Sequence, residues 1–141
     1  MFKNVFLLSI SSSLFSTVFS YVYMNIYFHK IVDFSEPFGI TAVFINNLIA
    51  FMIGFFVFLG IKKLIKKESI SEFTFNLLVT MITFMSIFHV LQMTDPEFKN
   101  EEAGVMIDYY KCYLMPLLFF PALSWFVLKP IFIKNNYFKI L

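Results

Sequence analysis

The fold is decided by the stretch Leu59-Gly60-Ile61-Lys62-Lys63-Leu64-Ile65-Lys66-Lys67, which places four lysines within six residues. An apolar run that begins near Gly39 ends at this stretch, and another apolar run begins at Phe73. Each run is long enough to cross the roughly 30 Å hydrocarbon core of a bilayer as a helix. Because lysines collect in the cytoplasmic loops of membrane proteins, the pattern predicts a helical hairpin whose connection lies in the cytoplasm.

The composition of the whole chain agrees with a membrane protein. Of its 141 residues, 60% are hydrophobic and 14% are charged, and the mean hydropathy is +0.80. A soluble domain of this size needs more polar surface to cover its core, so the lipid bilayer is the expected surrounding. The net charge of +2 is too small to indicate a nucleic-acid partner. The single cysteine, Cys112, excludes an internal disulfide framework and a cysteine-based zinc site.

Two further apolar runs bring the number of predicted membrane spans to four. Residues 1–20 also have the pattern of a signal peptide, but the apolar run continues for about two helical turns beyond Ser20, which favours a transmembrane helix. The predicted fold is all-α, an antiparallel bundle of four transmembrane helices that forms a single domain over residues 1–141. The predicted helices cover about residues 4–28, 39–61, 73–93 and 108–128.

The charges of the connecting segments predict the orientation of these spans. Both predicted outer loops, residues 29–38 and 94–107, carry a net negative charge, and lysines dominate the opposite ends of the helices. This asymmetry predicts cytoplasmic N and C termini for a multi-pass protein of the bacterial inner membrane. Asp95-Pro96-Glu97, together with a glycine at position 104, predicts a short interfacial helix over about residues 96–103. The Ser-x-x-Glu spacing of Ser69 and Glu72 predicts a capping box that opens the third span.

Two rows of small residues predict close packing between helices. Small side chains let the backbone of a neighbouring transmembrane helix approach closely. In the fourth span, Pro116 and Pro121 each remove a backbone hydrogen bond, which predicts a kink or local unwinding. The two rows are Ser9, Ser13, Ser16 and Ser20 in the first span and Ala42, Asn46, Ala50 and Gly54 in the second.

A candidate polar site is predicted near the outer ends of the helices. Amide and charged groups in hydrocarbon need partners, so they are expected to face protein. Asp108 and Lys111 are three residues apart on one helix, and we expect them to turn into the bundle as an ion pair. No HExxH or comparable spacing is present, so neither a metal nor a cofactor is expected. The candidate residues are Asp33, Glu36, Asn46, Asn47, His89, Asp108 and Lys111.

Several short patterns resemble those of an uncharacterised four-helix inner-membrane protein family of Bacteroidota. These patterns are Tyr23-Met24-Asn25-Ile26-Tyr27, Val32-Asp33-Phe34-Ser35, Phe119-Phe120-Pro121-Ala122-Leu123 and Leu128-Lys129-Pro130. They cover both ends of the chain and little of its middle. The resemblance implies an inner-membrane location and no particular activity.

The sequence leaves three classes of function open. The polar rows have the spacing of packing seams, which favours a protein that is not an enzyme and that acts as an accessory or structural subunit of a membrane complex or as a homo-oligomer. The alternative is a small-solute or ion transporter or channel, in which Asn46, Asn47 and His89 line a path. The third is an enzyme that modifies lipid headgroups with the outer carboxylates and histidines.

Overall fold

A computed structural model describes residues 2–31, 34, 39–93 and 103–134 of the chain. This part folds into four α-helices, α1 (Phe2–Lys30), α2 (Ile40–Leu64), α3 (Glu68–Leu91) and α4 (Ala103–Lys129), followed by one π-helical turn, η1 (Pro130–Lys134). Four helical segments are long and apolar enough to cross a membrane, namely α1, α2, α3 and Ile107–Ile133, which runs from α4 into η1. The predicted all-α bundle of four membrane-spanning helices is confirmed, and the chain is a multi-pass membrane protein.

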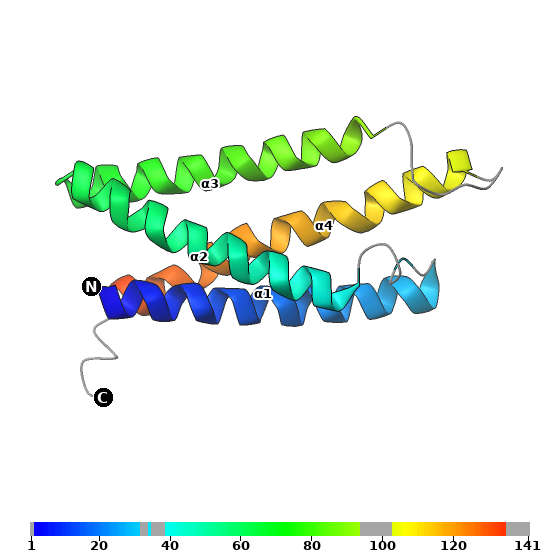
Figure 1. The fold of residues 1–141 in the computed structure, drawn as a ribbon, viewed down its shortest axis with the longest axis horizontal. Coiled ribbons are helices and arrows are strands. Elements are labelled where there is room, and N and C mark those ends of the chain that lie inside the picture. Colours follow the sequence, from blue (N-terminus) through cyan, green and yellow to red (C-terminus); the bar gives the residue numbers. More distant parts are fainter. Residues whose placement is uncertain (1, 32–33, 35–38, 94–102, 135–141) are drawn as a thin grey trace.

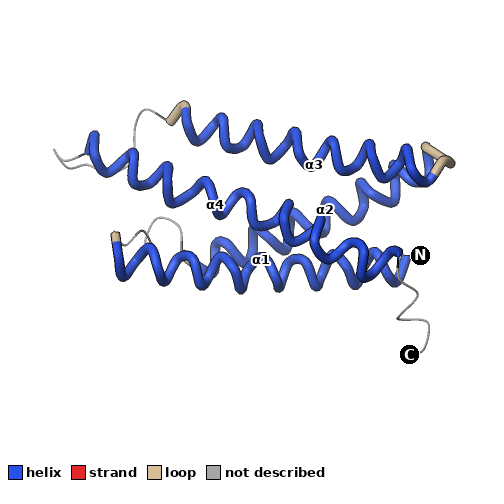
Figure 2. The backbone as a smooth tube through the Cα atoms, turned by 180° about the vertical axis from the view of Figure 1, so that it is seen from behind, coloured by secondary structure: helices blue, strands red, loops and turns tan. Residues whose placement is uncertain are grey.

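The four helices run along a common long axis, and consecutive helices point in opposite directions (Figure 1). The two opposite views place α3 on the far side of the bundle from α1, with α2 and α4 crossing between them (Figure 2). The first residues of α1, the connection between α2 and α3, and the end of α4 all lie at one end of the bundle. We call this the lysine end, because it includes Lys62, Lys63, Lys66 and Lys67.

The predicted serine face of α1 is packed against its neighbours. Ser9, Ser13, Ser16 and Ser20 are all buried, and Ser12 beside them is buried as well. Helix α1 packs against both α2 and α4, and the small hydroxyl side chains leave room for these helices to approach. The prediction that this face is a packing seam is therefore confirmed.

The predicted packing seam on α2 is wrong. In that row Asn46 and Ala50 are exposed, and Gly54 is only half-buried. The helix instead buries the row that follows one position along the sequence, which is turned by about 100° around the axis. This row carries large rings that fill the interior, and they outweigh the close approach that small residues offer. The buried residues of α2 are Val43, Asn47, Phe51, Phe55 and Phe58.

Helix α4 stays helical through Pro116 and Pro121, so of the two predicted outcomes, a kink or local unwinding, the unwinding does not occur. A proline has no N–H, and Pro116 therefore leaves the carbonyl of Cys112, four residues earlier, without its helical donor. The hydroxyl of Tyr23 on α1 donates a hydrogen bond to this carbonyl oxygen at 2.9 Å. A side chain of one helix thus replaces a backbone bond that the other helix lacks.

Replacing Tyr23 by phenylalanine is expected to lower the free energy of unfolding by roughly 0.5–1.5 kcal/mol, because the Cys112 carbonyl then loses its donor. Unfolding in mixed detergent micelles, followed by circular dichroism, measures the effect. The matched control is Tyr21→Phe, since Tyr21 is 55% exposed. Equal effects of the two changes would contradict the assigned role of the Tyr23 hydroxyl.

The predicted capping box at the start of the third span is also wrong. Helix α3 begins at Glu68, and its N-cap residue Lys67 makes no side-chain capping bond. Ser69 and Glu72 therefore lie within the first two turns of the helix, and Glu68 and Glu72 form ion pairs with lysines. The predicted interfacial helix lies outside the described residues, except for Ala103, the first residue of α4.

Candidate functional site

A network of charged side chains joins α2, α3 and α4 at the lysine end. The Lys62 ammonium lies 2.8 Å from a carboxylate oxygen of Glu68 and 3.9 Å from one of Glu72. The other oxygen of Glu72 lies 3.1 Å from the ammonium of Lys129, which also donates a hydrogen bond to the Asn76 side-chain oxygen at 3.3 Å. Glu72 on α3 is therefore shared between a lysine of α2 and a lysine of α4.

Both shared lysines are buried. The side chain of Lys62 is 7% exposed and that of Lys129 is 9% exposed, whereas Glu72 keeps 18% of its side-chain surface accessible. Charges removed from water are tolerated only when opposite charges and hydrogen bonds compensate them, and the two glutamates balance the two lysines here. The ammonium of Lys62 also lies 5.2 Å above the centre of the Phe58 ring, in a cation–π arrangement.

An aromatic cluster lies directly against this network. The ring centres of Phe58 and Phe75 are 5.0 Å apart, and Trp125 lies 5.0 Å from Phe75 and 5.7 Å from Phe58. Phe51 adds a fourth ring 6.4 Å from Trp125. Phe75 of the aromatic cluster and Glu72 of the charged network both belong to α3. The rings and the ion pairs therefore together attach the lysine end of α3 to the bundle.

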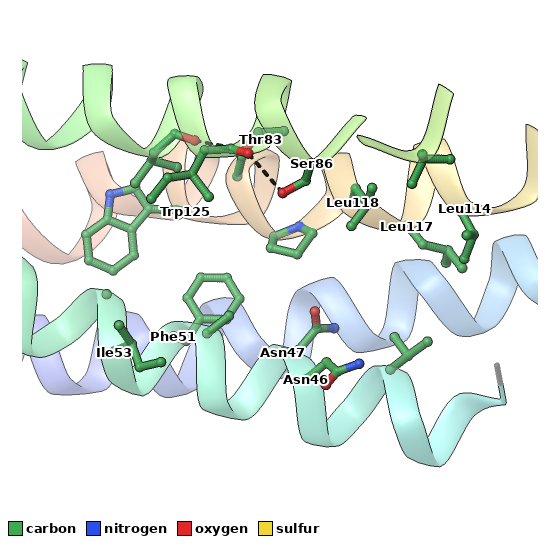
Figure 3. A pocket seen from close by; sticks show the side chains of 18 of the residues that line it. Asn46, Asn47, Phe51, Ile53, Thr83, Ser86, Leu114, Leu117, Leu118 and Trp125 are labelled. Atoms are coloured by element: carbon green, nitrogen blue, oxygen red, sulfur yellow. Dashed lines mark hydrogen bonds between the residues drawn. The ribbon is translucent and has the colours of Figure 1, made fainter. Parts of the chain in front are cut away.

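Beyond the aromatic cluster, α2, α3 and α4 enclose a cleft of about 690 Å³ (Figure 3). This volume falls in the range of ligand-binding pockets, about 300–1,000 Å³. Most of its lining is apolar, and none of the described side chains that line it is charged. The polar exceptions are Asn46 and Asn47 on α2, Thr83 and Ser86 on α3, and Tyr110 and Trp125 on α4.

The polar groups that line the cleft differ in whether they have hydrogen-bond partners. The hydroxyls of Thr83 and Ser86 each donate to the carbonyl four residues earlier, both at 2.9 Å. The Asn47 amide donates to the Thr17 hydroxyl of α1 at 3.1 Å. Asn46 is exposed, and within the described part of the chain its side chain makes no hydrogen bond. Figure 3 shows both asparagines on α2, across the cleft from Thr83 and Ser86.

The structure separates the residues of the predicted polar site. Asn46 and Asn47 line the cleft, while His89 is exposed and borders a second, shallower hollow between α3 and α4. Asp108 is exposed, and no ion pair joins it to Lys111 in the described ranges. The predicted inward turn of this pair is therefore wrong, because Tyr113, Leu114 and Leu117 fill the buried positions of α4. Asp33 and Glu36 lie outside the described residues.

Sequence reasoning missed the charged network, although a signal for it exists. Lys62 follows Phe51, Phe55 and Phe58 at helical spacing, so it continues the aromatic face of α2. Lys129 likewise lies one turn after the buried Trp125. A lysine placed on the buried face of a membrane helix indicates a paired charge rather than a residue that reaches water.

Metal chemistry finds no support in the described ranges, which contain no group of three or more histidine, cysteine, aspartate or glutamate side chains able to hold an ion. The described part of the chain therefore offers three features that bear on function: the charged network, the apolar cleft and the unpaired amide of Asn46. Comparison with protein-family models, with curated protein sequences and with solved structures gave no match.

Proposed function

We propose that the protein is a non-enzymatic accessory or structural subunit of a membrane complex or homo-oligomer, and that it binds a transmembrane helix of its partner in the cleft. The observation that carries this proposal is the pair Asn46 and Ala50, one turn apart on α2, which border the cleft and are both exposed. Small residues spaced four apart are the usual contact surface between membrane helices. Here Asn46 and Ala50 face the open cleft, whereas Gly54, one turn further on, lies against the Phe75 ring of α3.

Helix α3 supports the same proposal. Only 11% of the apolar membrane-spanning stretch of α3 is buried inside the protein, compared with 39% of that of α1 and 28% of that of α2. Large side chains such as Met85 and Phe84 are exposed along it, and its Thr80, Thr83 and Ser86 hydroxyls are bonded to its own backbone. These three hydroxyls therefore need no partner from outside, and the exposed part of α3 around them offers a largely apolar surface to a neighbour.

The cleft gives less support to transport or to headgroup chemistry. A channel or carrier needs a polar path through the bundle, and an acid–base enzyme needs a titratable group at the substrate. The described lining of the cleft carries no carboxylate, lysine or histidine side chain, and its one titratable group is the phenol of Tyr110. A protein helix of matching shape fits such a lining better than a hydrated solute does.

The proposed location is the bacterial inner membrane, with both termini in the cytoplasm. The lysine-rich connection of α2 and α3 lies at the same end of the bundle as the start of α1 and the end of α4 (Figure 1), and lysine-rich ends are retained in the cytoplasm. The sequence resemblance described above implies the same membrane. Reporter fusions after Leu64 and after Asn100 test the orientation, and a cytoplasmic reporter that is active at Asn100 would overturn it.

Purification in a mild detergent tests the proposed function. We expect a particle whose protein mass exceeds that of one chain, and we expect Ala50→Leu to dissociate it, because the larger side chain fills the binding surface. The matched control is Ile49→Phe, which enlarges the neighbouring side chain, 52% exposed, outside the cleft lining. A monomer that carries only lipid, or a particle that Ala50→Leu leaves intact, would contradict the proposal.

A further inference from the structure

We infer that the occupant of the cleft is a second copy of this chain, which docks so that Asn46 of each copy bonds Asn46 of the other about a two-fold axis along the membrane normal. This inference rests on the proposed function and adds the identity of the partner. It starts from the one cleft amide that, within the described part of the chain, has no hydrogen-bond partner.

The position of Asn46 places its amide in hydrocarbon. It lies six residues after Ile40, the first residue of α2, which corresponds to about 9 Å along the helix axis. Helix α2 has 25 residues and is longer than the hydrocarbon core by only about 8 Å in total, so the amide lies below the headgroups. The amide of the neighbouring Asn47 has a partner within the chain, because it donates a hydrogen bond to the Thr17 hydroxyl.

A lipid chain in the cleft would leave Asn46 unsatisfied. Acyl chains carry neither donors nor acceptors, and an unpaired amide in hydrocarbon is unfavourable. The nearby hydroxyls of Thr83 and Ser86 already donate to their own helix. A polar side chain of another protein can supply the partner of Asn46, and amides that bond across an interface hold membrane helices together.

A second copy supplies this partner without any further assumption. A side-chain amide carries both donors and an acceptor, so two asparagines related by a two-fold axis satisfy each other. Ala50 is exposed one turn after Asn46 on the same row, and its small size lets the two α2 backbones approach. Because no described side chain of the cleft lining is charged, two identical surfaces meet without repulsion.

Cysteine cross-linking in native membranes tests the geometry. Cys112, which is exposed, is first replaced by serine, and Ala50→Cys or Ile49→Cys is then introduced. Both native side chains are exposed, but only Ala50 lines the cleft. A two-fold axis along the membrane normal places the same residue of the two copies at the same depth in the membrane. We therefore expect oxidation to give covalent dimers several-fold faster with Ala50→Cys than with Ile49→Cys. Equal rates for the two variants would overturn the inference.

The mass of the purified particle tests the role of the amide. We expect a dimer for the unchanged chain, retention of the dimer in Asn46→Gln, which keeps the amide, and a monomer in Asn46→Leu. A dimer that persists in Asn46→Leu overturns the inference. A different protein that co-purifies in a fixed ratio and is lost in both Asn46→Leu and Ala50→Leu overturns only the self-pairing. A chain that is monomeric with lipid alone overturns the proposed function as well.

Discussion

Replacing Glu72 by glutamine is expected to lower the free energy of unfolding by about 3–5 kcal/mol, because the change leaves two buried lysines without their shared carboxylate. Lys129 then faces the neutral oxygen of Asn76, and the carboxylate that remains beside Lys62 is that of Glu68, whose side chain is 73% exposed. Unfolding in mixed detergent micelles measures the loss, and fluorescence reports it directly because the chain contains one tryptophan, Trp125, beside the network.

The control for this experiment is Glu68→Gln, which removes an exposed partner and should have a much smaller effect. Combining Glu72→Gln with Lys129→Met should recover part of the lost stability, since one of the stranded charges is then absent. If Glu72→Gln and Glu68→Gln proved equally mild, the network would be a surface feature and would not hold α3 in place.

Replacing Phe58 by alanine is expected to lower the free energy of unfolding by about 3 kcal/mol. The side chain is completely buried, and its removal opens a cavity beside Phe75 and Trp125 and takes away the ring over Lys62. We expect the lower end of the usual cost of Phe→Ala changes, because lipid, unlike water, also solvates an exposed ring, so that mainly packing is lost.

Circular dichroism is the better measurement for Phe58→Ala, since the substitution alters the surroundings of the tryptophan itself. The matched control is Phe56→Ala, because Phe56 is 63% exposed and lies on the same helix. A loss for Phe56→Ala as large as that for Phe58→Ala would show that ring size, and not burial in the cluster, determines the effect.

The number of helices was predictable from the sequence because the bilayer imposes a minimum length on each span. Four apolar runs separated by charged segments satisfy their backbone hydrogen bonds in a membrane most simply as four spanning helices. The bounds were less accurate where charges are neutralised inside the protein. Helix α3 starts at Glu68 and not at Phe73, because Glu68 and Glu72 are paired with lysines and need not lie in a hydrated loop.

The packed face of each helix was much harder to predict. In a soluble protein the buried face is apolar and the outer face polar, but in a membrane both faces are apolar, so hydrophobic periodicity does not distinguish them. Small residues were the remaining guide. They located the seam of α1 correctly, but on α2 the rings of Phe51, Phe55 and Phe58 occupy the interior instead. Within the candidate site, Asn46 and Asn47 do line the cleft, whereas Asp108 is exposed and does not turn into the bundle.

The lengths of the helices also bear on the bilayer around the protein. Helix α1 has 29 residues and α4 has 27, about 43 Å and 40 Å, and both extend past the start of α2 (Figure 1). A long helix ordinarily adapts to a thin membrane by tilting. Here the Tyr23 and Tyr27 hydroxyls attach α1 to α4 at two successive turns, at 2.9 Å and 2.7 Å. Since the two helices cannot tilt independently, a thin membrane is matched by a tilt of α1 and α4 together or by stretching of the surrounding lipids.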